Sequence, residues 1–443
     1  MQDRLTATAI SEDVRARRCS ARDVAKVTAR IIAAREPEVQ AFAYFDPDLL
    51  LAQADAVDEA EKGPLAGVTV AVKDVIATAD MPTGYNNTRY SDLQSGIDAA
   101  CVDTLRQAGA VMVGKSVTTE FAATQRGGKT RNPHDLTRTP GGSSSGSAAA
   151  VAAGMCAIGL GTQTGGSTIR PASYNGIWGW KPTWGVISRE GLKLYSLTCD
   201  TLGLYARDVA DFDLLAEVYD LDRVPEPDRL EGLRIGVVHP PAWDRVEPPM
   251  RAALEAGAAA LAAAGAEVAA LELPDDLAHI DDSHATILAR EGRAAFLNEA
   301  RAQPGRLHDE FRAMVENRGG ITAAQARAAY RHADLCRAQI DDVLAGCDAI
   351  LAPSAMGEAP VGLETTGDAA MNSLWTLLGL PVVSVPGHVG PNGMPLGLSV
   401  ICARYDDRRA IRIGALAGEA FARVRKSQAA GGVNSGAPAF PSE

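Results

Sequence analysis

Two glycine-rich segments that end in serine carry the residues of this sequence best suited to chemistry. The first is Gly141–Ser147, and the second is Gly161–Ser167. Glycine tolerates positive φ values, so the main chain of such turns can direct its amides toward a reacting oxygen. A serine at the end of a turn of this kind can act as a nucleophile while neighbouring amides stabilise the oxyanion that forms.

A lysine supplies the base that such a serine needs. Lys73 ends an apolar run that begins at Val68 and has the pattern of a buried strand. Because burial disfavours the charged ammonium, we expect the pKa of Lys73 to lie below its ordinary value. A neutral lysine together with two serines indicates a relay in which the amine takes up a serine proton.

Further short motifs surround these residues in a fixed order. Along the chain they are Pro64–Gly67, Lys73-Asp74, Gly114-Lys115, Asn132-Pro133, Gly141–Ser147, Thr164–Ser167 and Gly179–Thr183, with a weaker match at 348–402 that includes Leu380–Pro386. In order and spacing these motifs resemble the amidase signature family of serine hydrolases. That family uses a serine, a second serine on a cis peptide bond, and a lysine. The motif-rich signature core of this chain spans residues 64–210.

The resemblance assigns a role to each of three side chains. Ser167 corresponds to the nucleophile, Ser143 to the bridging serine and Lys73 to the general base. The two serines are 24 positions apart, as in the family. In the implied mechanism, neutral Lys73 takes the proton of Ser143 while Ser143 takes that of Ser167. The activated Ser167 then attacks the substrate carbonyl, and the proton returns to the leaving amine.

The resemblance also implies the surroundings of the nucleophile. The amides of Thr164, Gly165, Gly166 and Ser167 would form the oxyanion hole. We place the family's cis peptide bond at Ser143–Ser144, and we assign Ala122 and Ser144 to the substrate pocket. Neither a metal nor another cofactor is implied, and no His-Glu-x-x-His spacing is present in the sequence.

Two departures from the family pattern bear on the substrate. Gln163 stands where many relatives have aspartate, and Arg170 follows Ser167 by three positions where relatives have arginine after two. These changes favour hydrolysis of a non-peptide C–N bond in a small neutral amide or anilide through an acyl-Ser167 intermediate. A carbamate (urethane) hydrolase with the same three residues is the alternative. A glutamine-using amidotransferase subunit that needs a partner is the third hypothesis.

Three competing interpretations of the motifs fit their context less well. Gly109–Ser116 matches the phosphate-binding Walker A pattern, but an apolar strand occupies the place of its loop. Gly142–Gly146 matches the nucleophile elbow of α/β-hydrolases around Ser144, with His239 or His388 downstream, yet no buried strand precedes it. Glycine-serine runs also form flexible linkers, but the helix-forming Ala148–Ala153 follows directly.

Composition limits the compartment and the binding partners that we expect for this protein. The net charge of −12 and the pI near 5.2 argue against nucleic-acid or acidic-membrane binding. The seven cysteines are scattered, without Cys-x-x-Cys, which is typical of reduced thiols in a cytosol. No signal peptide or membrane-length apolar run is evident. We therefore expect a cytoplasmic enzyme with a small-molecule substrate, acting alone or as a homodimer.

Strand-like and helical runs alternate along the chain, which predicts an α/β fold with a mixed, twisted sheet covered by helices on both faces. The predicted strands are 68–72, 111–113, 157–160, 235–238, 267–273, 349–351 and 382–385, and residues 1–62 have a helical pattern. We predict one amidase domain over residues 1–426, with a variable helical substrate region at about 281–345 and the C-terminal part of the core at 348–426. Residues 427–443, rich in small residues, are predicted to be disordered.

Overall fold

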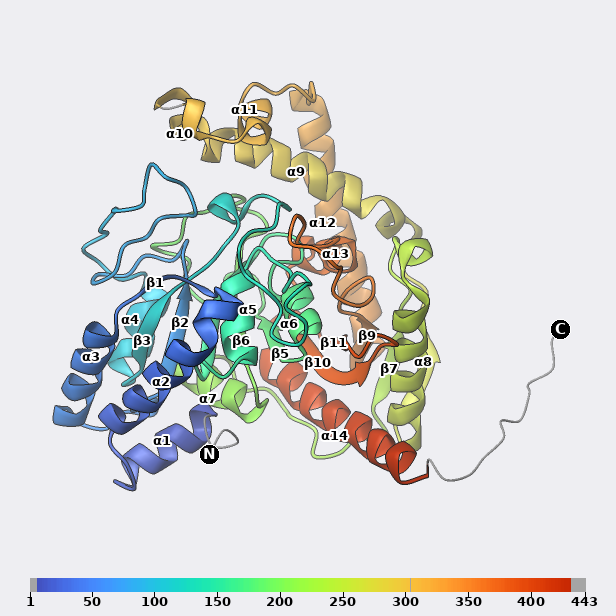
Figure 1. Cartoon of the computed structure of the whole chain (residues 1–443). Coiled ribbons are helices and arrows are strands. Elements are labelled where there is room, and N and C mark those ends of the chain that lie inside the picture. The colour runs from blue at the N-terminus through green and yellow to red at the C-terminus, as the bar shows by residue number, and fades with distance from the viewer. Residues whose placement is uncertain (1–5, 303, 432–443) are drawn as a thin grey trace.

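One mixed sheet connects the N-terminal and C-terminal halves of the chain (Figure 1). The computed structural model describes residues 6–302 and 304–431, and this part contains eleven strands in the order β1-β3-β2-β4-β6-β5-β10-β11-β9-β7-β8. Strand β2 is parallel to β3 and β4, and β7 is parallel to β8 and β9, whereas the other neighbours are antiparallel. The strands are β1 (Phe42–Phe45), β2 (Thr69–Lys73), β3 (Val111–Ser116), β4 (Ile158–Gln163), β5 (Trp178–Lys181), β6 (Thr201–Ala206), β7 (Arg234–Val237), β8 (Glu267–Ala270), β9 (Ala349–Pro353), β10 (Val382–Val389) and β11 (Pro395–Ile401).

Helices lie on both sides of this sheet, as predicted (Figure 1). They are α1 (Ala7–Arg15), α2 (Ala21–Val39), α3 (Pro47–Glu59), α4 (Ala100–Gln107), α5 (Ser145–Ala152), α6 (Ile169–Asn175), α7 (Ala210–Val218), α8 (Pro248–Ala263), α9 (Ile280–Ala295), α10 (Leu297–Ala302), α11 (Asp309–Val315), α12 (Ala323–Ala345), α13 (Ala370–Leu377) and α14 (Asp407–Gly431). Helices α9 to α12 occupy most of the stretch 281–345, for which a helical region is predicted. In the described part of the chain no helix has the length and apolar character needed to cross a membrane.

Neighbouring residues of β11 show how the two faces are covered. A side chain on Gly397 would lie 3.2 Å from Ser173 of α6, whereas the Leu398 side chain packs against Gly257 of α8. Successive strand residues point to opposite faces of a sheet. Helix α6 therefore covers one face, and α8 covers the other.

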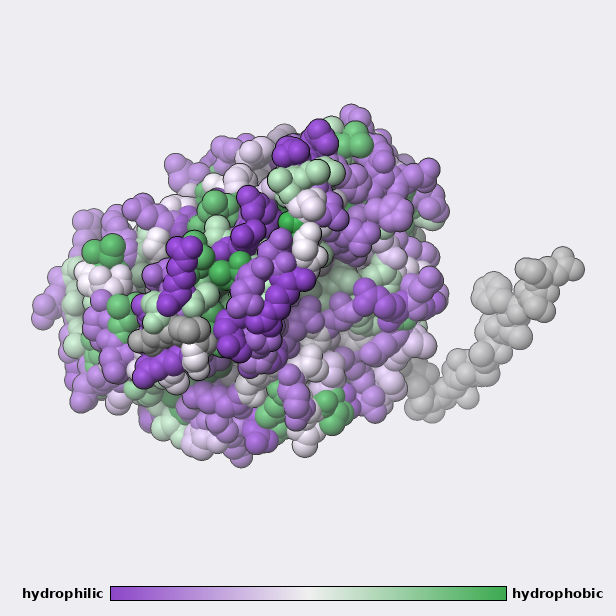
Figure 2. Space-filling model, turned by 90° about the horizontal axis from the view of Figure 1, so that it is seen from above, coloured by the Kyte–Doolittle hydropathy of each residue, from purple (hydrophilic) through white to green (hydrophobic). Residues whose placement is uncertain are grey.

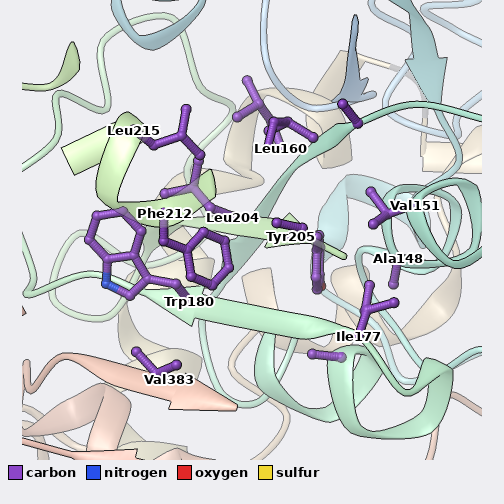
Figure 3. Packing of buried hydrophobic residues seen from close by; sticks show 14 of the residues in the cluster. Ala148, Val151, Leu160, Ile177, Trp180, Leu204, Tyr205, Phe212, Leu215 and Val383 are labelled. Atoms are coloured by element: carbon purple, nitrogen blue, oxygen red, sulfur yellow. The ribbon is translucent and has the colours of Figure 1, made fainter. Parts of the chain in front are cut away.

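Buried apolar side chains pack the middle strands against these helices. In Figure 3, Leu204 of β6 lies beside Phe212 of α7, while Tyr205, the next residue, lies on the side of Val151 of α5. The rings of Trp180 and Phe212 are 5.7 Å apart. Burial of this apolar area, worth roughly 25 cal/mol per Å² removed from water, fixes the strands that carry the candidate site.

The structure corrects several predicted boundaries. Residues 42–45 form β1 within a stretch predicted to be helical, and β5, β6 and β11 were not predicted as strands. Strands β1 and β5 have only four residues, and glycine interrupts β6, so their patterns are weak. Helix α14 continues to Gly431, which places residues 427–431 of the predicted disordered tail in a helix. Residues 432–443 lie outside the described residues.

The Walker A interpretation fails on the observed fold. Helix α4 precedes Gly109, and β3 occupies the segment where a phosphate loop would have to lie. Lys115 is buried, and its ammonium donates to the carbonyl oxygen of Ile76 at 2.6 Å and to the hydroxyl of Thr83 at 2.7 Å. Its role is therefore structural.

Candidate active site

Lys73 is the last residue of β2, a strand flanked by β3 and β4, and its side chain is fully buried. Its Nζ atom lies 2.8 Å from the hydroxyl of Ser143, 2.9 Å from that of Ser144 and 2.7 Å from that of Thr162. A neutral amine has two hydrogens and one lone pair, so three neighbouring hydroxyls match its capacity. Desolvation lowers the pKa of Lys73 well below its ordinary value, and the nearby Asp200 carboxylate raises it in part.

Ser143 lies in the turn that precedes α5, and a cis peptide bond joins Gly142 to Ser143. The bond predicted at Ser143–Ser144 is therefore one residue earlier than expected. Ser144 is the residue before α5, and its buried hydroxyl contacts Lys73 and Thr162. A Cβ on Gly161 would lie 2.8 Å from the Ser144 hydroxyl, so the glycine permits this close approach.

Ser167 lies between β4 and α6 and borders a cavity. Within the described residues its hydroxyl forms no hydrogen bond, and the amides of Gly165, Gly166 and Ser167 likewise donate none. Gln163 fixes the end of this turn, because its side-chain oxygen accepts from the amides of Thr168 at 2.8 Å and Ile169 at 3.0 Å. In the described part of the chain, three amides without protein partners therefore accompany the hydroxyl of Ser167.

The glycines of the two motifs serve mainly to allow close packing. Of those in Gly141–Ser147 and Gly161–Ser167, only Gly141 has a positive φ value, +80°. A Cβ on Gly142 would lie 2.5 Å from the Thr366 side chain, and one on Gly146 would lie 2.2 Å from the carbonyl oxygen of Ala41. The expectation that left-handed backbone shapes these turns therefore holds at one position.

The cavity beside Ser167 has a volume of about 340 Å³. Ala122, one of the two residues assigned to the substrate pocket, lies in its wall, whereas Ser144, the other, is not among the lining residues and contacts Lys73. Its walls include Ala122, Thr164, Gly165, Gly166, Ser167, Arg170, Tyr195, Arg245, Asp281, His284, Leu288, Asp368 and Ser373. The helical region therefore contributes to the same cavity as the signature motifs.

Comparison with known proteins assigns this architecture to a family. The family model described as Amidase matches residues 23–411. The chain belongs to the amidase signature family. Among curated relatives, a glutamyl-tRNA(Gln) amidotransferase subunit of Synechococcus sp. (strain RCC307) is 32% identical over 438 residues, which cover 86% of this chain and 90% of that protein.

Solved structures support the same assignment. One, described in a study of a vestigial protein complex and the origins of an s-triazine catabolic enzyme, is 30% identical with a TM-score of 0.83, covering 95% of this chain and 98% of that chain. A glutamyl-tRNA(Gln) amidotransferase subunit of Thermotoga maritima is 28% identical with a TM-score of 0.76, covering 89% and 91%. The chain is thus similar both to amidotransferase subunits and to a protein from the study of that vestigial complex.

Two residues of the candidate site were missed by sequence reasoning. Asp200 is buried, accepts from the Thr164 hydroxyl at 2.5 Å and from the Tyr195 amide at 2.6 Å, and desolvation raises its pKa to about 6. His284 of α9 lies 2.8 Å from the carbonyl oxygen of Thr164. In the sequence, Asp200 is marked only as the single charged residue between Lys193 and Arg207. No motif surrounds His284.

Proposed function

We propose that this amidase hydrolyses a non-peptide C–N bond of small uncharged amides or anilides through an acyl-Ser167 intermediate. The observation that carries the proposal is the contact of 2.8 Å between the buried Lys73 Nζ and the Ser143 hydroxyl. A lysine held neutral by burial is a base at neutral pH, and no positioned carboxylate or imidazole is needed for that step.

The proposed reaction begins with proton transfer. Lys73 takes the proton of Ser143 as Ser143 takes that of Ser167, and the Ser167 oxygen forms a bond to the substrate carbonyl carbon. The amides of Thr164 to Ser167 stabilise the resulting oxyanion. Collapse breaks the C–N bond, and the proton passes back through Ser143 to the leaving amine. Water then attacks the acyl-Ser167 ester, releasing the acid and restoring both serines.

The charges around the cavity favour uncharged substrates. The charged residues that line it are Arg170, Arg245, Asp281 and Asp368, two of each sign. Arg245 forms an ion pair with Asp368 at the more exposed side of the cavity. A substrate carboxylate would meet these acids and would lose hydration, which costs several kcal/mol without a dedicated partner. A cavity of about 340 Å³ suits a small molecule.

Carbamates are the second candidate substrate class. A carbamate carbonyl presents the same geometry to Ser167 and its amides, and it would give a carbamoyl-enzyme in place of an acyl-enzyme. Specificity between the two depends on side chains outside the motifs, such as Leu288 and Ser373.

An amidotransferase subunit is the alternative that the curated relatives favour. Such a subunit would need a partner surface. The face shown in Figure 2 is predominantly hydrophilic, and its apolar residues form small separate groups. Large apolar patches are typical of permanent partner interfaces, and the described residues visible on this face form none.

One experiment separates the candidates. The purified chain, without any added protein, is assayed on p-nitroacetanilide, a p-nitrophenyl carbamate and glutamine, with Ser167→Ala as the matched control. Turnover of the anilide that is lost in Ser167→Ala supports the proposal, and preferential turnover of the carbamate supports the second class. Inactivity on all three substrates, or ammonia release from glutamine alone, would refute the proposed substrate class.

A further inference from the structure

Two side chains outside the signature core (residues 64–210) bind carbonyl oxygens of the turn before Ser167. His284 of α9 lies with Nε2 2.8 Å from the carbonyl oxygen of Thr164, and the hydroxyl of Thr376 of α13 lies 2.6 Å from that of Gly165. Both side chains are buried. Because a carbonyl oxygen only accepts hydrogen bonds, His284 carries a hydrogen on Nε2 and donates it to Thr164.

These carbonyl groups determine where the neighbouring amides point. In a planar trans peptide, the C=O of one residue and the N–H of the next point in opposite directions. Fixing the Thr164 carbonyl therefore fixes the Gly165 N–H, and fixing the Gly165 carbonyl fixes the Gly166 N–H. Within the described part of the chain neither amide has a hydrogen-bond partner. A donor on the carbonyl side also polarises the peptide and strengthens its N–H as a donor.

We infer that His284 is a positioning residue for the oxyanion hole, acting through the Thr164 carbonyl, and that Thr376 acts in the same way on the next peptide. This inference rests on the proposed function, in which the Gly165 and Gly166 amides bind the oxyanion. If the inference holds, the variable helical region affects the rate of the reaction through His284 of α9. The Nε2 atom of His284 cannot take up a proton, because it already carries the hydrogen that it donates to Thr164.

The test compares His284→Leu with His284→Gln, which keeps an N–H donor of similar reach. We expect His284→Leu to lower kcat on p-nitroacetanilide by about 10- to 100-fold, with KM within about twofold, since loss of a whole oxyanion donor lowers kcat by about 10²- to 10³-fold. His284→Gln should recover part of this loss. His279→Leu is the matched control, because His279 is exposed at the start of the same helix and bonds to no residue of the turn in the described structure.

A second readout reports on the hole itself. Diisopropyl fluorophosphate reacts with a serine nucleophile by forming an O–P bond and releasing fluoride, and it leaves the P=O group where the oxyanion would lie. We expect the ³¹P resonance of the His284→Leu adduct to move from the wild-type position toward that of the urea-unfolded adduct, while His279→Leu keeps the wild-type position. Thr376→Val should move the same resonance in the same direction, and Thr376→Ser should restore it.

The outcomes distinguish the inference from the proposed function. Wild-type protein that does not react at Ser167 would overturn the proposed function and the inference with it. Wild-type labelling with an unchanged resonance and kcat in His284→Leu would overturn the inference alone. A loss of kcat in which the resonance does not move would also overturn it, since the effect would then lie elsewhere. If His284→Leu does not fold, the Thr376 pair decides the question.

Discussion

Arg170 donates from Nη2 to the carbonyl oxygen of Gly142 at 2.6 Å. The residue three positions after the candidate nucleophile therefore braces the turn that holds the candidate bridging serine. Arg170 is buried, and its Nε also donates to the carbonyl oxygen of Thr366 at 2.7 Å. The Nε and Nη2 atoms of Arg170 are thus used within the protein, whereas Nη1 has no hydrogen-bond partner among the described residues.

The proposed proton relay predicts that three alanine variants lose activity to different extents. Ser167→Ala should abolish acylation, because the bond to the substrate cannot form. Ser143→Ala and Lys73→Ala should lower kcat by about 10²- to 10⁴-fold, since they remove proton transfer and leave the oxyanion hole in place. Single-turnover kinetics with p-nitroacetanilide measures the three rates. If Ser167→Ala turned the substrate over at the wild-type rate, Ser167 would be excluded as the nucleophile. Labelling of Ser144 by diisopropyl fluorophosphate would instead support the nucleophile-elbow interpretation.

The pH dependence follows from the lowered pKa of Lys73. The neutral amine is the active form, so kcat/KM should rise with pH through that pKa and stay high in mildly alkaline solution. The profile is measured from about pH 5 to about pH 10 on p-nitroacetanilide, a range that brackets a lowered lysine pKa. The rising limb should be absent from the residual activity of Lys73→Ala. Persistence of the same limb in that variant would assign the titration to another group.

Asp200 should set where that limb lies. Its carboxylate raises the pKa of Lys73, so Asp200→Asn should move the rising limb of kcat/KM to lower pH. Asparagine keeps an oxygen that can accept from the Tyr195 and Ser196 amides. Asp222→Asn, at an exposed position, is the control and should leave the limb unchanged. A shift of the limb to higher pH in Asp200→Asn would contradict this electrostatic account.

Substrate charge should separate glutamine from anilides. The formal charges of Arg170, Arg245, Asp281 and Asp368 in the cavity wall cancel, so glutamine should be cleaved at least about 10²-fold less efficiently than a neutral anilide in kcat/KM. Ammonia release from glutamine is compared with nitroaniline release on the same preparation. Equal efficiencies would show that the charged end of glutamine is accommodated.

An aromatic cluster should hold the helical region against the signature core. Phe296 is fully buried, and its ring lies 5.6 Å from that of Phe121 and 4.7 Å from that of Phe311. Phe296→Ala should lower the free energy of unfolding by about 3–5 kcal/mol, through lost contacts and a cavity. Urea unfolding measures this change. Leu335→Ala, at a position 47% exposed, should change it by less than about 0.5 kcal/mol.

Much of the site could be predicted because its residues belong to motifs with fixed spacing. Lys73, Ser143 and Ser167 are each surrounded by glycines or apolar strand residues that mark their positions. Asp200 and His284 could not be found in this way, because each is a single polar residue brought to the Thr164 turn by tertiary packing. The position of the cis bond, at Gly142–Ser143, likewise depends on packing around the turn.

The fold was predictable in class but less so in detail. Apolar runs such as 68–72 and 382–385 identify buried strands, whereas β1 and β5 are too short for a clear period. Strand β11 begins at Pro395 and contains Gly397, two residues that disfavour strand interiors. Strand β11 is stabilised by its pairing with β9 and β10, which cannot be read from its own sequence.

Helix α9 contributes both to the wall of the cavity, through residues such as Leu288, and to the support of the turn before Ser167, through His284. An engineer who reshapes the cavity from this helix would therefore alter turnover and selectivity together. Ala122 reaches the same cavity from a distant part of the sequence and, within the described residues, makes no hydrogen bond to that turn. Substitutions at Ala122 should therefore change substrate selectivity without disturbing the support of the turn before Ser167.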